Sequence, residues 1–459
     1  MLSLLRVGLP VTLGACLACL APGVAQAAPA PAPADAGATA RAAATSGLAS
    51  ALTVMPVPVT APLGAPAGTL TVAGRPLAGA TVPVGAVVTF THPAAAKVSF
   101  VLDGSYVGGD TSPAFTWTAA GALGAHTLRA RAYDAGGQLL TRVDAGFVLG
   151  GGTPPPPPPP VAGASRVVDT VEEVRAALRD ARPGDVIDVR DGEYAFRPRL
   201  VASAQGTVTA PITLRGTRAV VLRSSGSDGD YGLHITGDHW RVEGLTVAHA
   251  SKGIVLDQSV GTVLDRVEVH DIGGEGVHFR SCSSFGVLRN SYVHDTGVRT
   301  PSYGEGVYVG SARSNWSSFA CAGGMDDTEG VSIVGSVFRR IPAEGADLKE
   351  GTDSGSLRGN LFDDVGYSGA NYSDSAVDAK GNGWRIEGNT VRGGRGAFLD
   401  AFQTHSVATG YGTRNVFRGN VVTGSLPGYG VRLSPALANV VGCDNVVPAG
   451  SRLANVTCR

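Results

Sequence analysis

The sequence predicts an all-β protein whose C-terminal two-thirds forms a right-handed parallel β-helix, with a short capping helix at its start and a small β-sandwich before it. Two observations support this fold class. Short strand-like segments that begin with glycine recur after residue 231 at a spacing of about 21 to 39 residues, as stacked coils require. The 459 residues also include 65 glycines and only 16% charged residues, a composition that suits short strands and tight turns.

Residues 1–27 have the features of a secretory signal peptide. Arg6 precedes an apolar segment that ends near Leu20, and residues 25–27 form the small-x-small pattern of a cleavage site. We therefore expect cleavage after Ala27 and a secreted, extracellular protein. A lipoprotein anchored through Cys16 is the alternative interpretation. No later segment reaches the roughly 20 apolar residues of a membrane span, so we expect no membrane partner.

Changes in composition divide the rest of the chain into domains and linkers. Residues 28–50 consist almost entirely of small residues and proline and cannot form a core. Residues 151–163 contain the run Pro154–Pro160, which predicts a stiff polyproline spacer. Between these segments, residues 51–150 contain short strand-like segments joined by glycine-rich turns, the pattern of a small β-sandwich. Residues 164–459 carry the repeats and form the β-helix.

One part of the predicted sandwich resembles a known module. The segment Gly124–Gly136 is similar to immunoglobulin-like modules attached to secreted bacterial carbohydrate enzymes. The resemblance implies an immunoglobulin-like sandwich and says little about function. Trp117 is interpreted as a core residue of this sandwich, with a sugar-stacking role as the alternative.

Four cysteines remain after the signal peptide, and they predict disulfides formed in an oxidising compartment. We expect sequential pairing, although four cysteines allow three connectivities. The expected pairs are Cys282 with Cys321, across a long insertion, and Cys443 with Cys458, at the C-terminal end. Neither pair has the spacing of a metal site.

The β-helix is predicted to open with a helix and to continue with stacked strands. Val171–Arg179 has helical periodicity with Thr170 as its N-cap, and a Pro-Gly-Asp turn then leads to the strand Val186–Val189. Each later coil buries its apolar faces only by stacking on its neighbours, about 4.8 Å apart. Four asparagines recur near one point of a second strand type and predict an internal ladder: Asn290, Asn360, Asn389 and Asn420.

The opening of this domain resembles a family of polysaccharide lyases. The segment Val167–Asp191, with its helix, Pro-Gly-Asp turn and Asp-Gly-x-Tyr turn, is similar to the start of the alginate lyase and chondroitinase B family. Residues 165–445 resemble the wider group of β-helix polysaccharide lyases. In such lyases a lysine or arginine acts as the base beside Ca²⁺. This chain departs from the Glu-x-Glu pattern of chondroitinase B-type enzymes, because Ala346 occupies the second place and Asp347 follows.

The outer face of the first strand type predicts the functional site. The segments Glu275–Arg280, Glu305–Gly310, Glu344–Lys349, Ser375–Lys380 and Asp400–His405 align without gaps. Because side chains two apart share a face, three outward columns result. They are His278, Tyr308, Asp347, Asp378 and Gln403; then Arg280, Lys349, Lys380 and His405; and, at the turn before the strand, Glu275, Glu305, Glu344 and Asp400. Stacked like charges repel each other unless a bound ligand or a shifted pKa reduces the repulsion. The strip therefore indicates a functional site and not a merely solvated surface.

Such a strip suits β-elimination from an anionic, uronic-acid-containing polysaccharide. Carboxylates are the hard oxygen ligands that Ca²⁺ prefers, and Ca²⁺ would neutralise the substrate carboxylate. The predicted metal ligands are Glu305, Glu344, Asp347 and Asp378. From the resemblance we predict Lys349 as the base, followed by Lys380, with His405 as a further catalytic group. Neighbouring cations would lower the pKa of Lys349 and neighbouring carboxylates would raise it. The predicted substrate-binding residues are Arg280, His278, Tyr308, Glu275 and Gln403.

Two other classes of function stay open at this point. A glycoside hydrolase needs two carboxyl groups about 5–9.5 Å apart, for which Asp347 with Asp378, or Asp326 with Asp327, are candidates. A non-catalytic glycan-binding protein or adhesin would equally use a sandwich module and a long linker. The net charge of −1 gives no indication of a nucleic-acid partner, and we expect a monomer.

Overall fold

The computed structural model describes residues 68–151, 163–319 and 324–459, apart from residues 104, 112, 135–138, 435 and 437. The predicted signal peptide, the segment 28–50, the run Pro154–Pro160 and Cys321 therefore lie outside the described residues. Within the described part of the chain, no helix has the length and apolar character needed to cross a membrane.

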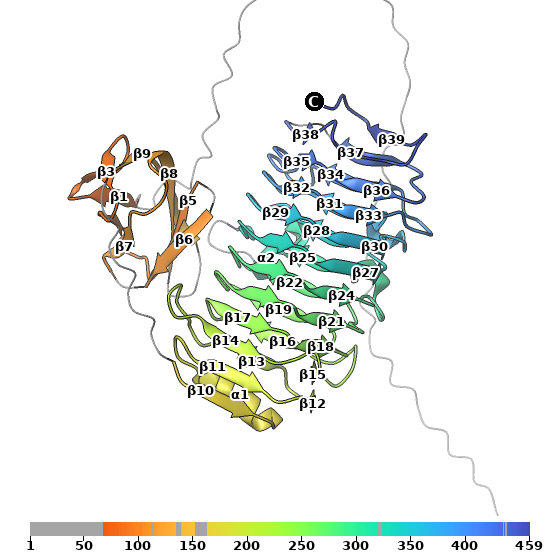
Figure 1. The fold of residues 1–459 in the computed structure, drawn as a ribbon, viewed down its shortest axis with the longest axis horizontal. Helices are drawn as coiled ribbons and strands as arrows, with labels where there is room; N and C mark the ends of the chain where they lie inside the picture. The colour runs from red at the N-terminus through yellow and green to blue at the C-terminus, as the bar shows by residue number, and fades with distance from the viewer. Residues whose placement is uncertain are drawn as a thin grey trace, which may run out of the picture. The chain divides into compact units, whose positions relative to one another are not determined.

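Three long parallel sheets build the C-terminal region, and each full coil adds one strand to each of them (Figure 1). The first sheet contains β10 (Ser165–Val168), β11 (Val186–Val189), β14 (Ile212–Arg215), β17 (Trp240–Glu243), β20 (Val263–Asp265), β23 (Val287–Arg289), β26 (Ser332–Val334), β29 (Ser356–Arg358), β32 (Arg385–Glu387), β35 (Val416–Arg418) and β38 (Val440–Val441). The second contains β12 (Gly192–Ala195), β15 (Val220–Arg223), β18 (Thr246–Ala248), β21 (Glu268–His270), β24 (Tyr292–His294), β27 (Val337–Ile341), β30 (Leu361–Val365), β33 (Thr390–Arg392) and β36 (Val421–Thr423).

The third sheet carries the predicted functional strip. It contains β13 (Leu200–Ala202), β16 (Leu233–Ile235), β19 (Ile254–Asp257), β22 (Val277–Arg280), β25 (Val307–Val309), β28 (Ala346–Leu348), β31 (Ser375–Ala379), β34 (Asp400–His405), β37 (Tyr429–Ser434) and β39 (Arg452–Ala454). Neighbouring strands pair in parallel, as in β22 with β25 and β25 with β28. The predicted parallel β-helix is confirmed.

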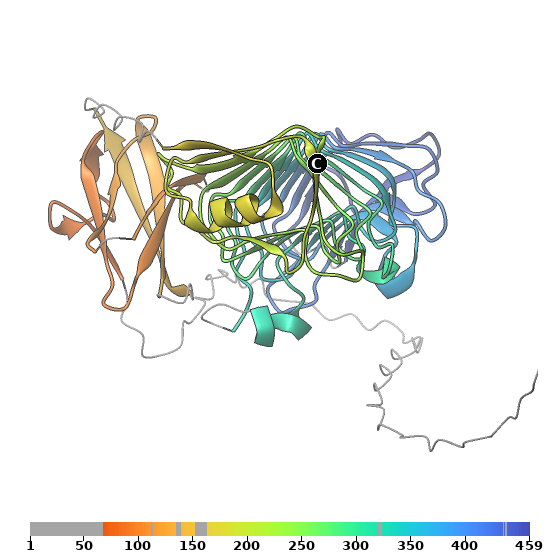
Figure 2. The same ribbon diagram turned by 90° about the horizontal axis from the view of Figure 1, so that it is seen from below.

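The first coil is capped by the predicted helix, α1 (Val171–Asp180). Thr170 Oγ1 accepts a hydrogen bond from Glu173 N at 3.2 Å, and the Glu173 carboxylate accepts one from Asp169 N at 3.0 Å. This reciprocal pair satisfies two backbone N–H groups at the start of the helix. Val174, Ala177 and Leu178 are buried, and α1 packs against β10, β11 and β13. Figure 2 shows α1 across the end of the coils, which lie one behind another.

Stacked side chains fill the interior, including an asparagine ladder. Asn360 Nδ2 donates to Asn389 Oδ1 at 3.0 Å, and Asn389 and Asn420 repeat this bond to the next asparagine, ending at Asn445. The prediction was wrong for Asn290, whose amide donates to Asp265 Oδ1. The reason is register: the ladder position of that coil falls one residue later, at Ser291, whose backbone N–H donates to Ser336 Oγ.

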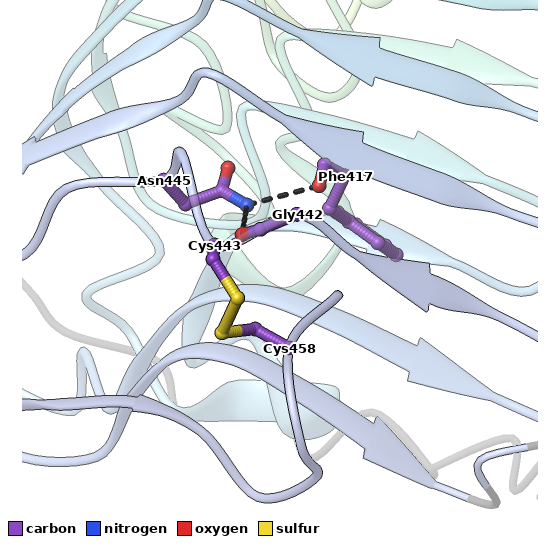
Figure 3. Close-up of a disulfide and its surroundings, with 5 residues drawn as sticks. All are labelled: Phe417, Gly442, Cys443, Asn445 and Cys458. Atoms are coloured by element: carbon purple, nitrogen blue, oxygen red, sulfur yellow. Dashed lines mark hydrogen bonds between the residues drawn. A yellow bond between two sulfur atoms is a disulfide. The ribbon is translucent and has the colours of Figure 1, made fainter.

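The C-terminal end is closed by the predicted disulfide between Cys443 and Cys458, which are 15 residues apart (Figure 3). Beside it, Asn445 Nδ2 donates to Phe417 O and Gly442 O at 2.9 and 2.7 Å. Cys282 is also disulfide-bonded, but its predicted partner, Cys321, lies outside the described residues.

Residues 69–150 form two sheets around a separate core. One sheet contains β2 (Arg75–Pro76), β1 (Thr69–Val72), β4 (Val87–Thr91) and β7 (Phe115–Thr118). The other contains β3 (Thr81–Pro83), β9 (Leu139–Gly150), β8 (Gly124–Tyr133), β5 (Lys97–Leu102) and β6 (Ser105–Asp110). Trp117 is buried in this core against the Phe147 ring, as a core residue would be. Membership of the immunoglobulin-like class stays a prediction.

Short helices occur in the loops that precede or follow strands of the third sheet. They are η1 (Pro301–Tyr303), η2 (Arg313–Asn315), α2 (Trp316–Phe319) and η3 (Ala370–Tyr372). η1 and η3 contact each other, and they precede β25 and β31 respectively. These loops therefore border the strands that carry the predicted strip.

Candidate active site

The third sheet aligns the first predicted column coil by coil. The register pairs His278 with Tyr308, Tyr308 with Asp347, Asp347 with Asp378, and Asp378 with Gln403. The gap-free alignment of the sequence is therefore reproduced in space. The column continues to Arg432, the partner of Gln403 on β37.

Three acidic residues meet at the centre of the strip. Glu305, Glu344 and Asp347 are all buried, and one oxygen atom of each lies within 4.8 Å of the others. Burial, followed by repulsion from neighbouring carboxylates, raises the pKa of Glu305 and raises that of Glu344 to about 8. Glu305 Oε2 has no hydrogen-bond partner in the described part of the chain. This cluster has the chemistry of a cation site and includes three of the four predicted metal ligands.

Two lysines hold the carboxylate of Asp347. Lys349 Nζ lies 2.8 Å from Asp347 Oδ2, and Lys380 Nζ lies 2.8 Å from Asp347 Oδ1. Burial lowers the pKa of each lysine, but attraction to Asp347 outweighs burial and raises the pKa above its usual value. The predicted lowering by neighbouring cations is therefore outweighed. In this arrangement both lysines are protonated at neutral pH.

Asp378, the fourth predicted metal ligand, lies beside Asp347 in the register of the third sheet and contacts two cations. Its Oδ2 atom lies 2.7 Å from Lys380 Nζ, and its carboxylate pairs with His405 Nδ1 at 2.9 Å. Burial raises the pKa of Asp378, but these cations outweigh burial and lower it. The hydrogen bond to Asp378 raises the pKa of His405. The cluster of three acids does not include Asp378, whose carboxylate contacts Lys380 and His405 instead.

The column also includes an aromatic pair. The His278 and Tyr308 rings meet edge to face, with centroids 4.4 Å apart. His278 Nε2 lies 2.9 Å from Gly310 O, to which a protonated Nε2 donates, and burial holds the pKa of His278 well below its usual value. Tyr308 is buried and its ring centroid lies 5.0 Å from Lys349 Nζ. Tyr308 is therefore a direct neighbour of the Lys349 ammonium group.

Other predicted substrate contacts have protein partners in this structure. Arg280 is buried, and its guanidinium donates to Asp257 at 2.7 Å and to Tyr231 Oη at 3.2 Å. Glu275 forms an ion pair with Lys252. In the next coils, Gln403 Nε2 donates to Asp374 Oδ1 at 2.9 Å and to Asp400 Oδ2 at 3.0 Å. These bonds fix the walls of the site.

A groove of about 570 Å³ opens beside the strip. From the predicted set it is lined by Glu344, Asp347, Lys349, Asp378, Lys380, Gln403 and His405. Tyr372 and Arg432 also line it, and the sequence prediction missed both. Arg432 had a readable signal, because residues 430–433 repeat the strand type of the strip. Tyr372 had none, because it lies in the variable loop before β31.

The second carboxyl pair considered for a hydrolase is structural. Asp326 accepts hydrogen bonds from the backbone N–H groups of Ser281 and Cys282 at 2.9 and 2.8 Å. Asp327 forms ion pairs with Arg142 at 2.6 Å and Arg131 at 3.1 Å. Both carboxylates are buried and satisfied by the protein, so they do not form an open catalytic pair.

Comparisons with known proteins agree with this architecture. Residues 231–422 match the model of the right handed beta helix region. A crystal structure of alginate lyase from Paenibacillus sp. str. FPU-7 is 33% identical, with a TM-score of 0.59, and the match covers 63% of this chain and 97% of that one. Pectate lyase L of Paenibacillus polymyxa (strain SC2) is 23% identical over 243 residues, which cover 48% of this chain and 50% of that protein. The chain thus spans about half the length of this curated relative. The chain belongs to the right-handed parallel β-helix polysaccharide lyases.

Proposed function

We propose that the protein is a secreted, calcium-dependent lyase that cleaves a uronic-acid-containing polysaccharide by β-elimination. The observation that carries this proposal is the contact between a buried cluster of three acids and two lysines. β-Elimination requires that the uronate carboxylate be neutralised and that the proton at C5 be removed. The acidic cluster can bind a cation that neutralises the uronate carboxylate, and one of the lysines can act as the base that removes the C5 proton.

The acidic cluster fits a divalent cation. The carboxyl groups of Glu305 and Glu344 lie close together and have raised pKa values, and the buried Glu305 Oε2 has no hydrogen-bond partner among the described residues. A cation held by Glu305, Glu344 and Asp347 would relieve this repulsion. Oxygen donors suit Ca²⁺, which takes six to eight oxygen ligands and would need further ligands from water or substrate. When bound, Ca²⁺ supplies charge neutralisation at the substrate carboxylate and at the developing enolate.

Lys349 is the proposed base, and the charge on Asp347 controls the pKa of Lys349. Asp347 raises the pKa of Lys349 when its charge is uncompensated. Sharing that charge with a cation weakens the attraction and lets the pKa fall, which frees Lys349 to accept the C5 proton. The electron pair of the C5–H bond then forms the C4–C5 double bond as the C4–O bond breaks.

The neighbouring groups orient the base and complete proton transfer. Lys380 contacts both Asp347 and Asp378, which fixes the Asp347 carboxylate beside Lys349. His405, whose pKa is raised by its hydrogen bond to Asp378, is the proposed proton donor to the departing oxygen. A hydrolase based on Asp347 and Asp378 has less support, because each carboxylate is already paired with two cations of the protein.

Two further observations support the substrate and the compartment. The names of the relatives refer to alginate and pectate, which are both uronic-acid polymers. The Cys443–Cys458 disulfide is typical of a protein that folds outside the reducing cytosol. Both agree with a secreted enzyme that acts on an extracellular polyuronate.

The test is a substrate screen with the full mature chain. Alginate, pectate and chondroitin are incubated with the protein, and the unsaturated product is followed by its ultraviolet absorbance. We expect product from at least one polymer, loss of activity with EDTA and recovery with added Ca²⁺. Absence of unsaturated product from all of these polymers in the presence of Ca²⁺ would overturn the proposed function.

A further inference from the structure

The column of the active site extends beyond the proposed catalytic groups and ends in a cation. Arg432 on β37 lies three strands beyond Asp347 along the third sheet, after Asp378 and Gln403. Strands of a parallel sheet are about 4.8 Å apart, so Arg432 lies roughly 14 Å along the stack from Asp347. Both residues line the same groove. The groove therefore connects the acidic cluster with a remote guanidinium group.

Arg432 is less tied to the protein than the other cations of the groove. Its side chain is 47% exposed, and its nearest described carboxylate partner is Asp400 Oδ2 at 3.7 Å. The Asp400 carboxylate already accepts hydrogen bonds from Gln403 Nε2 at 3.0 Å and from the backbone N–H of Tyr429 at 2.6 Å. By contrast, the side chains of Lys349 and Lys380 are only 12% exposed and lie within 2.8 Å of carboxylates. Arg432 thus retains donors for a ligand.

An exposed aromatic ring lines the same groove. Tyr372 is 87% exposed, which is unusual for a tyrosine in a structured loop. Its backbone has φ of 63°, and the preceding Asn371 has φ of 56°, so two consecutive non-glycine residues are left-handed. Such strained conformations are concentrated at ligand-binding sites. The loop holds an apolar ring face toward solvent at the groove, where a sugar ring can stack on it.

We propose that Arg432 and Tyr372 form a binding subsite for a sugar unit remote from the bond that is cleaved. Arg432 binds the carboxylate of that unit through its planar pair of N–H donors, and Tyr372 stacks on a sugar ring. This inference rests on the proposed function and deepens it. The substrate is then a polymer with carboxylates on successive units, long enough to reach from Asp347 to Arg432.

The test compares Arg432→Ala and Tyr372→Ala with the unaltered protein on a uronate polymer and on oligosaccharides of increasing length. We expect KM on the polymer to rise at least about tenfold, the equivalent of about 1.4 kcal/mol, with kcat changed less than about twofold. The difference should vanish on oligosaccharides too short to reach the subsite. Arg432→Lys should give an intermediate KM, and Tyr372→Phe should keep the KM of the unaltered protein, because stacking does not need the hydroxyl group.

Arg392→Ala is the matched control. Arg392 is an exposed arginine of the second sheet, with a similarly long ion pair of 3.4 Å to Asp363. Thermal melts first establish that each variant is folded. If Arg432→Ala and Tyr372→Ala give the same KM as Arg392→Ala, the subsite does not exist, although the lyase function stands.

Calorimetric binding separates this proposal from the proposed function. Long uronate oligosaccharides are titrated into Lys349→Ala protein with and without Arg432→Ala. Affinity that falls about tenfold with Arg432→Ala supports the subsite even if the unaltered protein eliminates no polymer. Binding that is equal in both proteins, or absent from both, overturns the subsite.

Discussion

Lys349 follows Asp347 by two residues, and its Nζ atom lies 2.8 Å from the Oδ2 atom of that carboxylate. Lys380, one coil further, holds the other oxygen of Asp347 at the same distance. One buried carboxylate therefore keeps two ammonium groups in place. The proposed base and the proposed cation site are coupled through Asp347, so changes at either one should alter the other.

Lys349→Ala should abolish proton removal without emptying the site. Glu305, Glu344 and Asp347 remain, so Ca²⁺ and substrate should still bind, while kcat falls at least about 10²-fold. Steady-state kinetics and calorimetric Ca²⁺ titration provide the measurement. Lys380→Ala is the comparison: if it loses more than Lys349→Ala in kcat while Lys349→Ala is nearly unchanged, the base is Lys380.

Asp347→Asn should act through the cation. The substitution replaces one carboxylate of the acidic cluster with a neutral amide, so the affinity for Ca²⁺ should fall. Added Ca²⁺ should then partly restore activity. Asp363→Asn, on the second sheet, is the control and should leave the calcium dependence unchanged. A variant that stays inactive at every calcium concentration would instead indicate that Asp347 acts in the chemical step.

The stability of the calcium-free protein should fall as the pH rises from about 4.5 to about 8. The folded-state pKa of Glu344 is about 8, against an ordinary value of 4.5. Across this interval the folded protein holds a proton that the unfolded chain has released. The free energy of unfolding then decreases with pH, by up to about 1.4 kcal/mol per unit for one proton. Thermal melts across this range test the slope.

Glu344→Gln should reduce the slope of that pH dependence, because the amide does not titrate, while Glu305, whose pKa is also raised, still contributes. Ca²⁺ should flatten it as well, because bound cation stabilises the ionised form. Glu387→Gln, on the first sheet, is the control and should keep the slope of the unaltered protein. An unchanged slope in Glu344→Gln would show that other groups set the pH dependence.

Asn389→Ala should destabilise the β-helix strongly. The Asn389 amide donates to Leu357 O at 2.8 Å and to Asn420 Oδ1 at 3.0 Å, and its oxygen accepts from Asn360 N at 3.0 Å. Its loss leaves buried groups in two coils without partners, at a cost of about 2–4 kcal/mol. Asn290→Ala, outside the ladder, should cost less than Asn389→Ala, because the Asn290 side chain is exposed rather than buried. Urea denaturation of both variants measures the difference, and equal losses would contradict the ladder.

The sequence allowed the register of the strip to be predicted but not its ion pairs. Glu275–Arg280 and its counterparts align without gaps, so each pairing of the third sheet followed from one residue count. Whether Asp378 turns toward the acids or toward Lys380 depends on side-chain rotamers and on charges from other coils. The prediction for Asn290 was wrong because this asparagine lies one residue before the ladder position, and the sequence pattern does not resolve a shift of one residue.

Residues contributed by loops were harder to predict than residues on strands. Tyr372 lies in η3, and the loops before the strands of the third sheet differ in length from coil to coil. No repeat therefore marks its position. Arg432 lay within the repeat, but recognising its role required knowing that the groove extends past Gln403.

The two ends of the stack are closed by different means. α1 covers the first coil, and the Cys443–Cys458 disulfide fastens the C-terminal segment beside the last strands. A stack of parallel strands otherwise ends in open backbone N–H and C=O groups, which can recruit a strand from a second molecule. The disulfide therefore does more than stabilise one loop. It joins the loop after β38 to the segment after β39, so the last strands of the first and third sheets stay in place at an edge where a strand of a second molecule could otherwise pair.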